Sequence, residues 1–219
     1  MRRQTWRNWF GASLGLVAVV VLSIRYIDRP LARLTGTLPL FHHFLTRAPV
    51  SFPILVILAG VAIMLALGHR FLGKPFSRWM TAGTIAGLAL ILSVVLTEYG
   101  LKFIFGRTLP SAYLQSGQYG FHWFQEGDKF GSFPSGHTDQ AAAILSVLWV
   151  FYPRWRWAYV IVLFLLSFAL MAGQWHFLSD IIAGGYVGTV AGAATMSIWN
   201  AILRRRRDRT DDGSTIAFN

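Results

Sequence analysis

The 219-residue sequence contains no cysteine and few charged residues. Without cysteine it forms no disulfide, which is compatible with an active face that is exported and has no use for such bonds. Charged residues make up 13% of the chain and hydrophobic residues 54%, and the mean hydropathy is +0.49. This composition is too apolar for an ordinary soluble domain. It indicates an integral membrane protein.

Six apolar runs approach the roughly 20 residues that a membrane-spanning helix needs. They are Ala12–Ile27, Ser51–Gly68, Met80–Leu96, Thr138–Tyr152, Ala158–Gly173 and Ile181–Leu203. With their flanks they use most of the length, so a separate soluble domain does not fit. The predicted fold is an all-α bundle of six transmembrane helices over residues 1–209, with a polar tail over 210–219 that we expect to be disordered. No small-residue cleavage site follows the first run, which we interpret as an uncleaved helix.

Acidic residues are scarce, 9 against 20 lysines and arginines, giving a net charge of +11. Thirteen of the basic residues fall in four patches, which are Arg2, Arg3 and Arg7; Arg70, Lys74 and Arg78; Arg154 and Arg156; and Arg204 to Arg207 with Arg209. The patches alternate along the six runs as the positive-inside rule requires for two cytoplasmic termini. We therefore expect the charge to set topology and to meet anionic lipids at the cytoplasmic face, and not to bind nucleic acid.

This topology places three connecting segments outside the cytoplasm, over Asp28–Val50, Thr97–Gly136 and Trp175–Asp180. We expect the first to lie in the membrane interface as a short amphipathic piece. Aromatic residues crowd the second, and the cluster from Tyr119 to Phe124 is typical of an anchor at headgroup level.

Two histidine motifs emerge on this same outer side. Pro134-Ser135-Gly136-His137 stands where the fourth run begins, and a helix N-terminus with a serine cap favours an anion. His137, in the first turn, is placed to act as a general acid. His176 precedes Asp180 by four residues, so a carboxylate on the same helix face can fix the histidine tautomer and leave the other ring nitrogen free to attack phosphorus.

Lys102, the Pro-Ser-Gly-His stretch, and His176 with Asp180 together resemble the type 2 phosphatidic acid phosphatase superfamily of membrane lipid phosphatases. The resemblance covers nearly the whole chain and implies the same six-helix plan with the site outside. It implies that His176 is the nucleophile, that His137 protonates the leaving group and that Asp180 orients His176. Lys102, Ser135 and Gly136 would bind phosphate, without a metal or other cofactor.

The chain departs from the family pattern at two arginine positions. Leu109 stands where the first motif usually has arginine before proline, and Leu170 stands six residues before His176, where the third motif usually has another. Losing one preorganised donor typically costs about 10²–10³ in rate. Arg107 could swing in as a substitute, and Gln174 could add a neutral contact beside the nucleophile. The substrate could also present a less charged phosphate, such as a diester or diphosphate, the enzyme could be slow, or the site could bind without turnover.

Several residues keep an alternative structural interpretation. Lys102 follows Glu98 by four residues, so a simple ion pair would explain both. Asp139 is interpreted as a cap of the helix that begins near Ser135, although it could instead pair with Arg107 or tune His137. His42, His43 and His122 could supply a metal site, but their spacing does not demand one.

The sequence thus predicts a protein of the bacterial inner membrane that hydrolyses a lipid phosphate or diphosphate on the periplasmic side. Two other functions stay open: a lipid phosphotransferase that uses the same histidine pair with a non-water acceptor, and a non-catalytic protein that binds or transports lipid phosphates. The lipid and the oligomeric state are not predicted.

Overall fold

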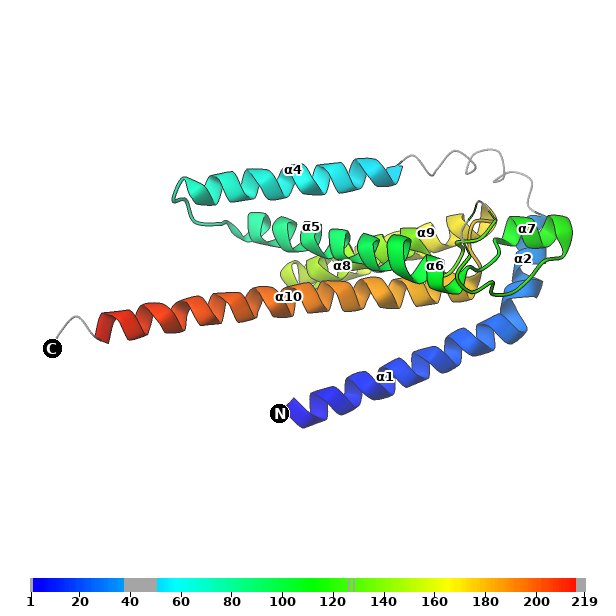
Figure 1. Ribbon diagram of the computed structural model, residues 1–219, viewed down its shortest axis with the longest axis horizontal. Coiled ribbons are helices and arrows are strands. Elements are labelled where there is room, and N and C mark those ends of the chain that lie inside the picture. The colour runs from blue at the N-terminus through cyan, green and yellow to red at the C-terminus, as the bar shows by residue number, and fades with distance from the viewer. Residues whose placement is uncertain (1, 38–50, 126, 128, 216–219) are drawn as a thin grey trace.

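The computed structural model describes residues 2–37, 51–125, 127 and 129–215, and every regular element in them is helical (Figure 1). The long helices are α1 (Arg2–Leu22), α4 (Ser51–Phe71), α5 (Arg78–Leu96), α8 (Gly136–Phe151), α9 (Arg156–Ala172) and α10 (Leu178–Thr215). The short ones are α2 (Asp28–Gly36), α6 (Lys102–Phe105), α7 (Pro110–Ser116), the π-helical turns η1 (Ser23–Ile27) and η3 (Thr97–Leu101), and the 3₁₀ turn η4 (Pro153–Trp155).

Each of the six predicted apolar runs is helical. Within the described residues, four continuous helical stretches are long and apolar enough to cross a membrane, namely Trp9–Gly36, Arg78–Phe105, Pro153–Ala172 and Leu178–Arg206. The apolar part of α4, Val56–Phe71, is shorter, and α8 has 16 residues. The all-helical membrane architecture is confirmed, while the count of six crossings stays a prediction.

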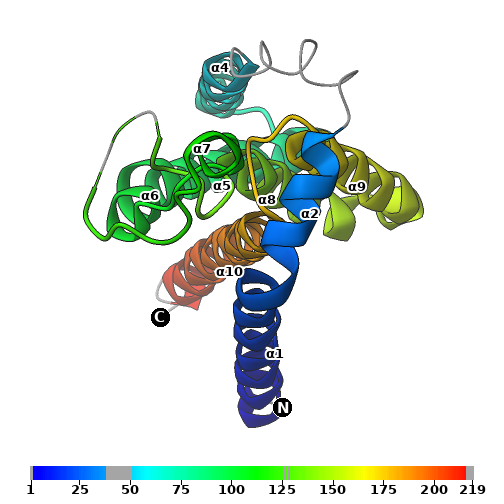
Figure 2. The ribbon, with the colours of Figure 1, turned by 90° about the vertical axis from the view of Figure 1, so that its right-hand side faces the viewer.

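The centre of the bundle is built from α5, α8 and α10, which pack through small residues. Ala89 and Ala143 are completely buried. A Cβ placed on Gly188 would lie 1.9 Å from the Asp139 carbonyl oxygen, and one on Gly184 would lie 2.3 Å from the Ser135 carbonyl oxygen. These glycines therefore let α10 approach the backbone of α8 directly, as small residues do between membrane helices. Figures 1 and 2 place α1 and α4 on opposite sides of this centre.

The short elements gather at one end of the bundle. Figure 1 shows α2, α6 and α7 there, while α1 begins and α10 ends away from it. The two π-helical turns lie just before Asp28 and Lys102, at the start of α2 and α6. Single π-helical turns inside helices are frequent at functional sites. Here one such turn precedes each of these two charged residues.

The described residues between Gly106 and Gly131, apart from α7, form an irregular layer over this end that is held by backbone contacts. Isolated antiparallel bridges join Arg107 to Phe121 and Thr108 to Phe130. Gly106 has a left-handed backbone with φ of +49°, and a Cβ there would lie 1.9 Å from the His122 carbonyl oxygen, so the residue type is required. At the other end of the bundle, α10 continues to Thr215, six residues into the segment 210–219 that was predicted to be disordered.

Candidate active site

The end that carries the short helices contains an open cleft of about 380 Å³. Its walls come from η3, α6, the Gly106–Gly131 connection, the first turn of α8 and the loop between α9 and α10. The lining includes Glu98, Lys102, Leu109, His137, Trp175 and His176. Residues up to 78 positions apart in the sequence thus face the same space, with both motif histidines among them.

The two histidines reach this cleft from different directions. His137 lies in the first turn of α8, where the Ser135 hydroxyl accepts a hydrogen bond from the Thr138 amide at 3.4 Å. His176 lies in the loop before α10, whose amides at Trp175 and His176 donate to the Leu170 carbonyl at 3.0 and 3.4 Å. The ring centroids are 6.1 Å apart, close enough for one phosphate group to contact both imidazoles.

A backbone carbonyl fixes the tautomer of His176. Its Nδ1 lies 2.8 Å from the Ser132 carbonyl oxygen, and because a carbonyl only accepts, Nδ1 carries the proton and Nε2 carries the lone pair. The Asp180 carboxylate lies 3.9 Å from Nδ1, so the prediction of a direct orienting bond from Asp180 is wrong. Burial, together with the nearby Lys102 and His137, lowers the pKa of His176 well below its usual value. The buried ring is therefore a neutral nucleophile.

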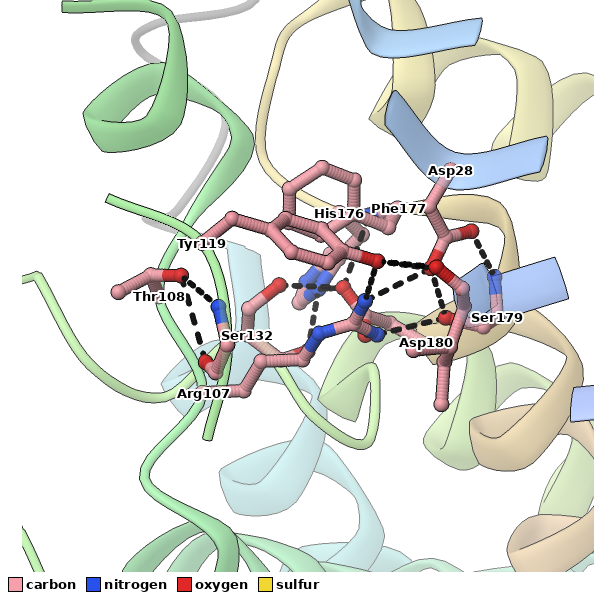
Figure 3. Close-up of polar contacts among 11 residues, drawn as sticks. Asp28, Arg107, Thr108, Tyr119, Ser132, His176, Phe177, Ser179 and Asp180 are labelled. Carbon is pink, nitrogen blue, oxygen red and sulfur yellow. Dashed lines mark hydrogen bonds and ion pairs between the residues drawn. The ribbon is translucent and has the colours of Figure 1, made fainter. Parts of the chain in front are cut away.

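Asp180 acts on His176 through Ser132. One carboxylate oxygen accepts the Phe177 amide at 2.8 Å and the Ser132 hydroxyl, and the other accepts from Arg107 (Figure 3). Asp180 and Ser132 are both fully buried. The carboxylate thus holds the residue whose carbonyl holds the imidazole, so its influence on His176 is indirect.

Arg107 does not reach the cleft, contrary to its predicted role in substrate binding. The guanidinium is completely buried and bonded to Asp180, to Asp28 at 2.7 Å and to Ser179 at 2.6 Å. Burial alone would lower the pKa of Arg107, but the two carboxylates raise it above its usual value, so the group stays charged. Four aromatic rings surround it within 6 Å, the nearest being Phe177 at 4.7 Å. A side chain held on so many sides cannot swing toward a substrate.

Lys102 faces the cleft and also makes the ion pair that its spacing predicted. Its Nζ lies 2.8 Å from a Glu98 carboxylate oxygen, and both side chains are partly exposed. Gly136 lies directly against this pair, because a Cβ there would meet the Glu98 carboxylate at 2.0 Å and Lys102 Nζ at 3.3 Å. The glycine of the motif therefore makes room for the lysine beside His137.

Other predicted residues lie outside the cleft. The Gln174 side-chain amide donates to the Thr35 hydroxyl at 2.7 Å and to the Met171 carbonyl at 3.1 Å, so it joins α2 to the loop and does not face a substrate. Asp139 is fully buried and its carboxylate accepts no backbone amide of α8, so its interpretation as the cap is wrong. His42 and His43 lie outside the described residues, and the alternative of a metal site stays untested.

Comparison with known proteins identifies the family. Residues 79–204, more than half of the chain, match the family model described as PAP2 superfamily. The chain belongs to the PAP2 superfamily. This confirms the resemblance drawn from the motifs, because the matched range contains Lys102, both histidines and Asp180.

Curated PAP2-type relatives match over part of their length. The chain is 31% identical over 106 residues to a lipid A 1-phosphatase of Rhizobium johnstonii, covering 48% of this chain and 41% of that one. It is 32% identical over 84 residues to a lipid A 1-phosphatase of Rhizobium etli, covering 38% and 36%. The matched stretch thus spans about two fifths of the length of these relatives.

Solved structures share the PAP2 fold. LpxE of Aquifex aeolicus superposes with a TM-score of 0.50 at 22% identity, covering 78% of this chain and 95% of that one. A transmembrane PAP2-type phosphatidylglycerolphosphate phosphatase from Bacillus subtilis gives a TM-score of 0.50 at 15% identity, covering 88% and 96%. At these identities the likeness establishes the fold alone.

The two leucines at the positions where the resemblance implied arginine, Leu109 and Leu170, differ in their surroundings. Leu109 lines the cleft, so an arginine there would face a bound phosphate. Leu170 is buried at the end of α9, and its carbonyl anchors the loop that carries His176. Among the described residues that line it, the cleft therefore presents one lysine, Lys102, and an apolar wall at Leu109.

Sequence reasoning missed Asp28 and Ser179, which bind Arg107. It also missed Ser132, which binds His176 and Asp180. Asp28 had a usable signal, because an acid at the end of an apolar run is a functional candidate by default. Ser132 had none, since both the bond from its carbonyl to His176 and the bond from its hydroxyl to Asp180 arise only from the tertiary fold.

Proposed function

We propose that this protein is a membrane lipid-phosphate phosphatase that cleaves a phosphomonoester or diphosphate of a membrane lipid through a phosphohistidine at His176. The observation that carries the proposal is the meeting of His137 and His176 in one cleft, with ring centroids 6.1 Å apart and Lys102 beside them. The curated relatives are named lipid A 1-phosphatases, which makes a lipid A phosphate a leading substrate.

Each step of the reaction has a residue suited to it. His176 Nε2 attacks phosphorus because Nδ1 is held by the Ser132 carbonyl. The bond from phosphorus to the lipid oxygen breaks as His137 gives that oxygen a proton. Water, deprotonated by His137, then attacks the phosphohistidine, releases inorganic phosphate and restores both rings. Lys102 neutralises charge on the phosphoryl oxygens throughout.

The site faces the periplasm of a bacterial inner membrane in this proposal. The connection between α4 and α5, and the end of α10, lie at the end of the bundle away from α2, α6 and α7 (Figure 1). Two of the four basic patches belong to these segments. Because basic residues favour the cytoplasmic side, the arrangement supports a cleft on the opposite face, with both termini in the cytoplasm and six crossings.

Phosphate release from a panel of lipids by the purified protein tests the proposal. The panel contains phosphatidic acid, phosphatidylglycerophosphate, a polyprenyl diphosphate and lipid A. We expect wild type to release phosphate from at least one, His176→Ala to release none, and His69→Ala, a histidine on α4 far from the cleft, to match wild type. No release from any lipid, or equal release by His176→Ala, would contradict the proposal. If the lipid substrate is consumed and its phosphate appears on a second lipid, with no free phosphate, the protein is a phosphotransferase and not a hydrolase.

A further inference from the structure

Asp28 is a buried acid that no sequence motif contains and that lies outside the family-matched residues 79–204. It begins α2, directly after the π-helical turn η1. Both carboxylate oxygens are engaged: Oδ1 accepts the Ser179 amide at 3.1 Å, and Oδ2 accepts the Ser179 hydroxyl at 2.5 Å and an Arg107 nitrogen at 2.7 Å. Figure 3 shows these contacts converging from α2, the connection after α6 and the start of α10.

Arg107 joins Asp28 to Asp180. One terminal nitrogen of the guanidinium binds Asp28 and the other binds Asp180, and all three side chains are buried. The cluster holds two negative charges and one positive charge. Each carboxylate is thus paired with a positive charge, and the Arg107 guanidinium that supplies this charge is itself buried away from solvent.

The line of contacts continues from Asp180 to the imidazole in the cleft. The Ser132 hydroxyl donates to Asp180, and the Ser132 carbonyl accepts Nδ1 of His176 at 2.8 Å. An unbroken series of bonds therefore runs from α2 to the ring that faces the cleft, through Arg107, Asp180 and Ser132. Asp28 is not among the residues that line that cleft.

We propose that Asp28 is a positioning residue that sets the orientation of His176 through Arg107, Asp180 and Ser132. The proposal rests on the proposed function, since it concerns the geometry of the nucleophile. Without the Asp28 carboxylate, the Ser179 amide and hydroxyl and one side of Arg107 lose their acceptor. Ser179 precedes Asp180 in the first turn of α10, so the shift reaches the Asp180 carboxylate directly. Misplacement of a reacting group by about 1 Å can cost about 10²-fold in rate.

The test compares Asp28→Asn with wild type on whichever lipid phosphate of the panel wild type hydrolyses. Asparagine keeps the size of the side chain and leaves Arg107 and Asp180 as a neutral pair, so the fold persists. We expect kcat to fall about 10- to 100-fold, the usual effect of outer-shell orienting groups, with KM unchanged because Asp28 does not touch the cleft. Unchanged kcat, or a rise in KM that accounts for the whole loss, would overturn the proposal.

A matched control and a double variant separate positioning from folding. Ser13→Ala removes a 2.5 Å hydrogen bond to Tyr186 that also ties the N-terminal segment to α10, away from the cleft. We expect it to leave kcat unchanged. Combining Asp28→Asn with Ser132→Ala should cost less than the product of the two single effects, because both act along one series of contacts. If the loss of kcat in the double variant equals the product of the two single losses, the proposal is overturned.

Imidazole ¹⁵N spectra of histidine-labelled protein, assigned with His176→Ala, test the positioning without turnover. In wild type we expect the His176 signals to show a proton fixed on Nδ1. In Asp28→Asn we expect a mixture of tautomers. Identical spectra would overturn the positioning role even if wild type is active. A wild type that hydrolyses no lipid would overturn the proposed function alone, because the spectra still decide the role of Asp28.

Discussion

Replacing Arg107 by glutamine should destabilise the protein far more than replacing an exposed arginine. Arg107 is completely buried and is the cation bonded to both Asp28 and Asp180. Glutamine cannot carry the charge, so two buried carboxylates would face each other without it. Removing one partner of a buried ion pair costs about 3–5 kcal/mol, a large part of the 5–15 kcal/mol that folded domains typically have.

That cost corresponds to a fall in the midpoint of thermal unfolding of about 6–20 °C for a chain of this size. The assay is thermal unfolding of purified protein in detergent micelles, followed by tryptophan fluorescence. Arg154→Gln is the matched control, because Arg154 is exposed at η4. Arg107→Lys should fall between the two, since lysine keeps the charge but cannot span both carboxylates with a fork of donors. If Arg107→Gln unfolds at the temperature of Arg154→Gln, the ion cluster does not stabilise the site. If Arg107→Gln loses turnover but keeps its stability, Arg107 binds the substrate, as the sequence suggested.

Three further predictions concern the cleft and the loop that carries the nucleophile. Ser132→Ala removes the hydroxyl bonded to Asp180 and so breaks the series of contacts next to His176; we expect a loss of about 1.5–3 kcal/mol in unfolding free energy and the same mixture of His176 tautomers as in Asp28→Asn, and an unchanged midpoint would contradict this. Burial, with Lys102 and His137 nearby, lowers the pKa of His176 below 6.5, so the folded protein keeps the ring neutral while the unfolded chain binds a proton below that pH. The free energy of unfolding should therefore fall as pH drops below 6.5, by at most about 1.4 kcal/mol per pH unit, and His176→Ala should flatten that slope; equal slopes would refute the assignment. Leu109→Arg should raise phosphate release about 10²–10³-fold by adding a hydrogen-bond donor to the cleft wall. Leu109→Met is the control and should leave the rate unchanged. Equal rates for the two variants would show that the cleft does not lack a donor at position 109.

The large-scale fold was predictable because apolar length and basic patches are strong signals in a membrane protein. All six apolar runs are helical, and the two histidine motifs meet although 39 residues separate them. The apolar runs and the basic patches together predicted that the motifs of His137 and His176 emerge on one side, next to helix starts. The family membership inferred from those motifs is confirmed by the match over 79–204.

The finer contacts were not predictable because they depend on tertiary placement. The i,i+4 spacing of His176 and Asp180 suggested a direct bond, but α10 begins at Leu178, after the histidine, so the two residues do not share a regular helix turn. Arg107 was taken for a substrate ligand because its spacing is close to a motif position. Its partner Asp28 lies 79 residues away in the sequence, and no local pattern reveals such a pairing.

The central claim is that a phosphoryl group resides on His176 during turnover, with His137 next to it. The direct measurement is mass spectrometry of peptides from protein quenched in alkali during turnover, where phosphohistidine survives. The account predicts a phosphoryl group on the peptide that contains His176 in wild type and none in His176→Ala. A phosphoryl group on His137 instead, or none on either histidine while lipid phosphate is being hydrolysed, would contradict it.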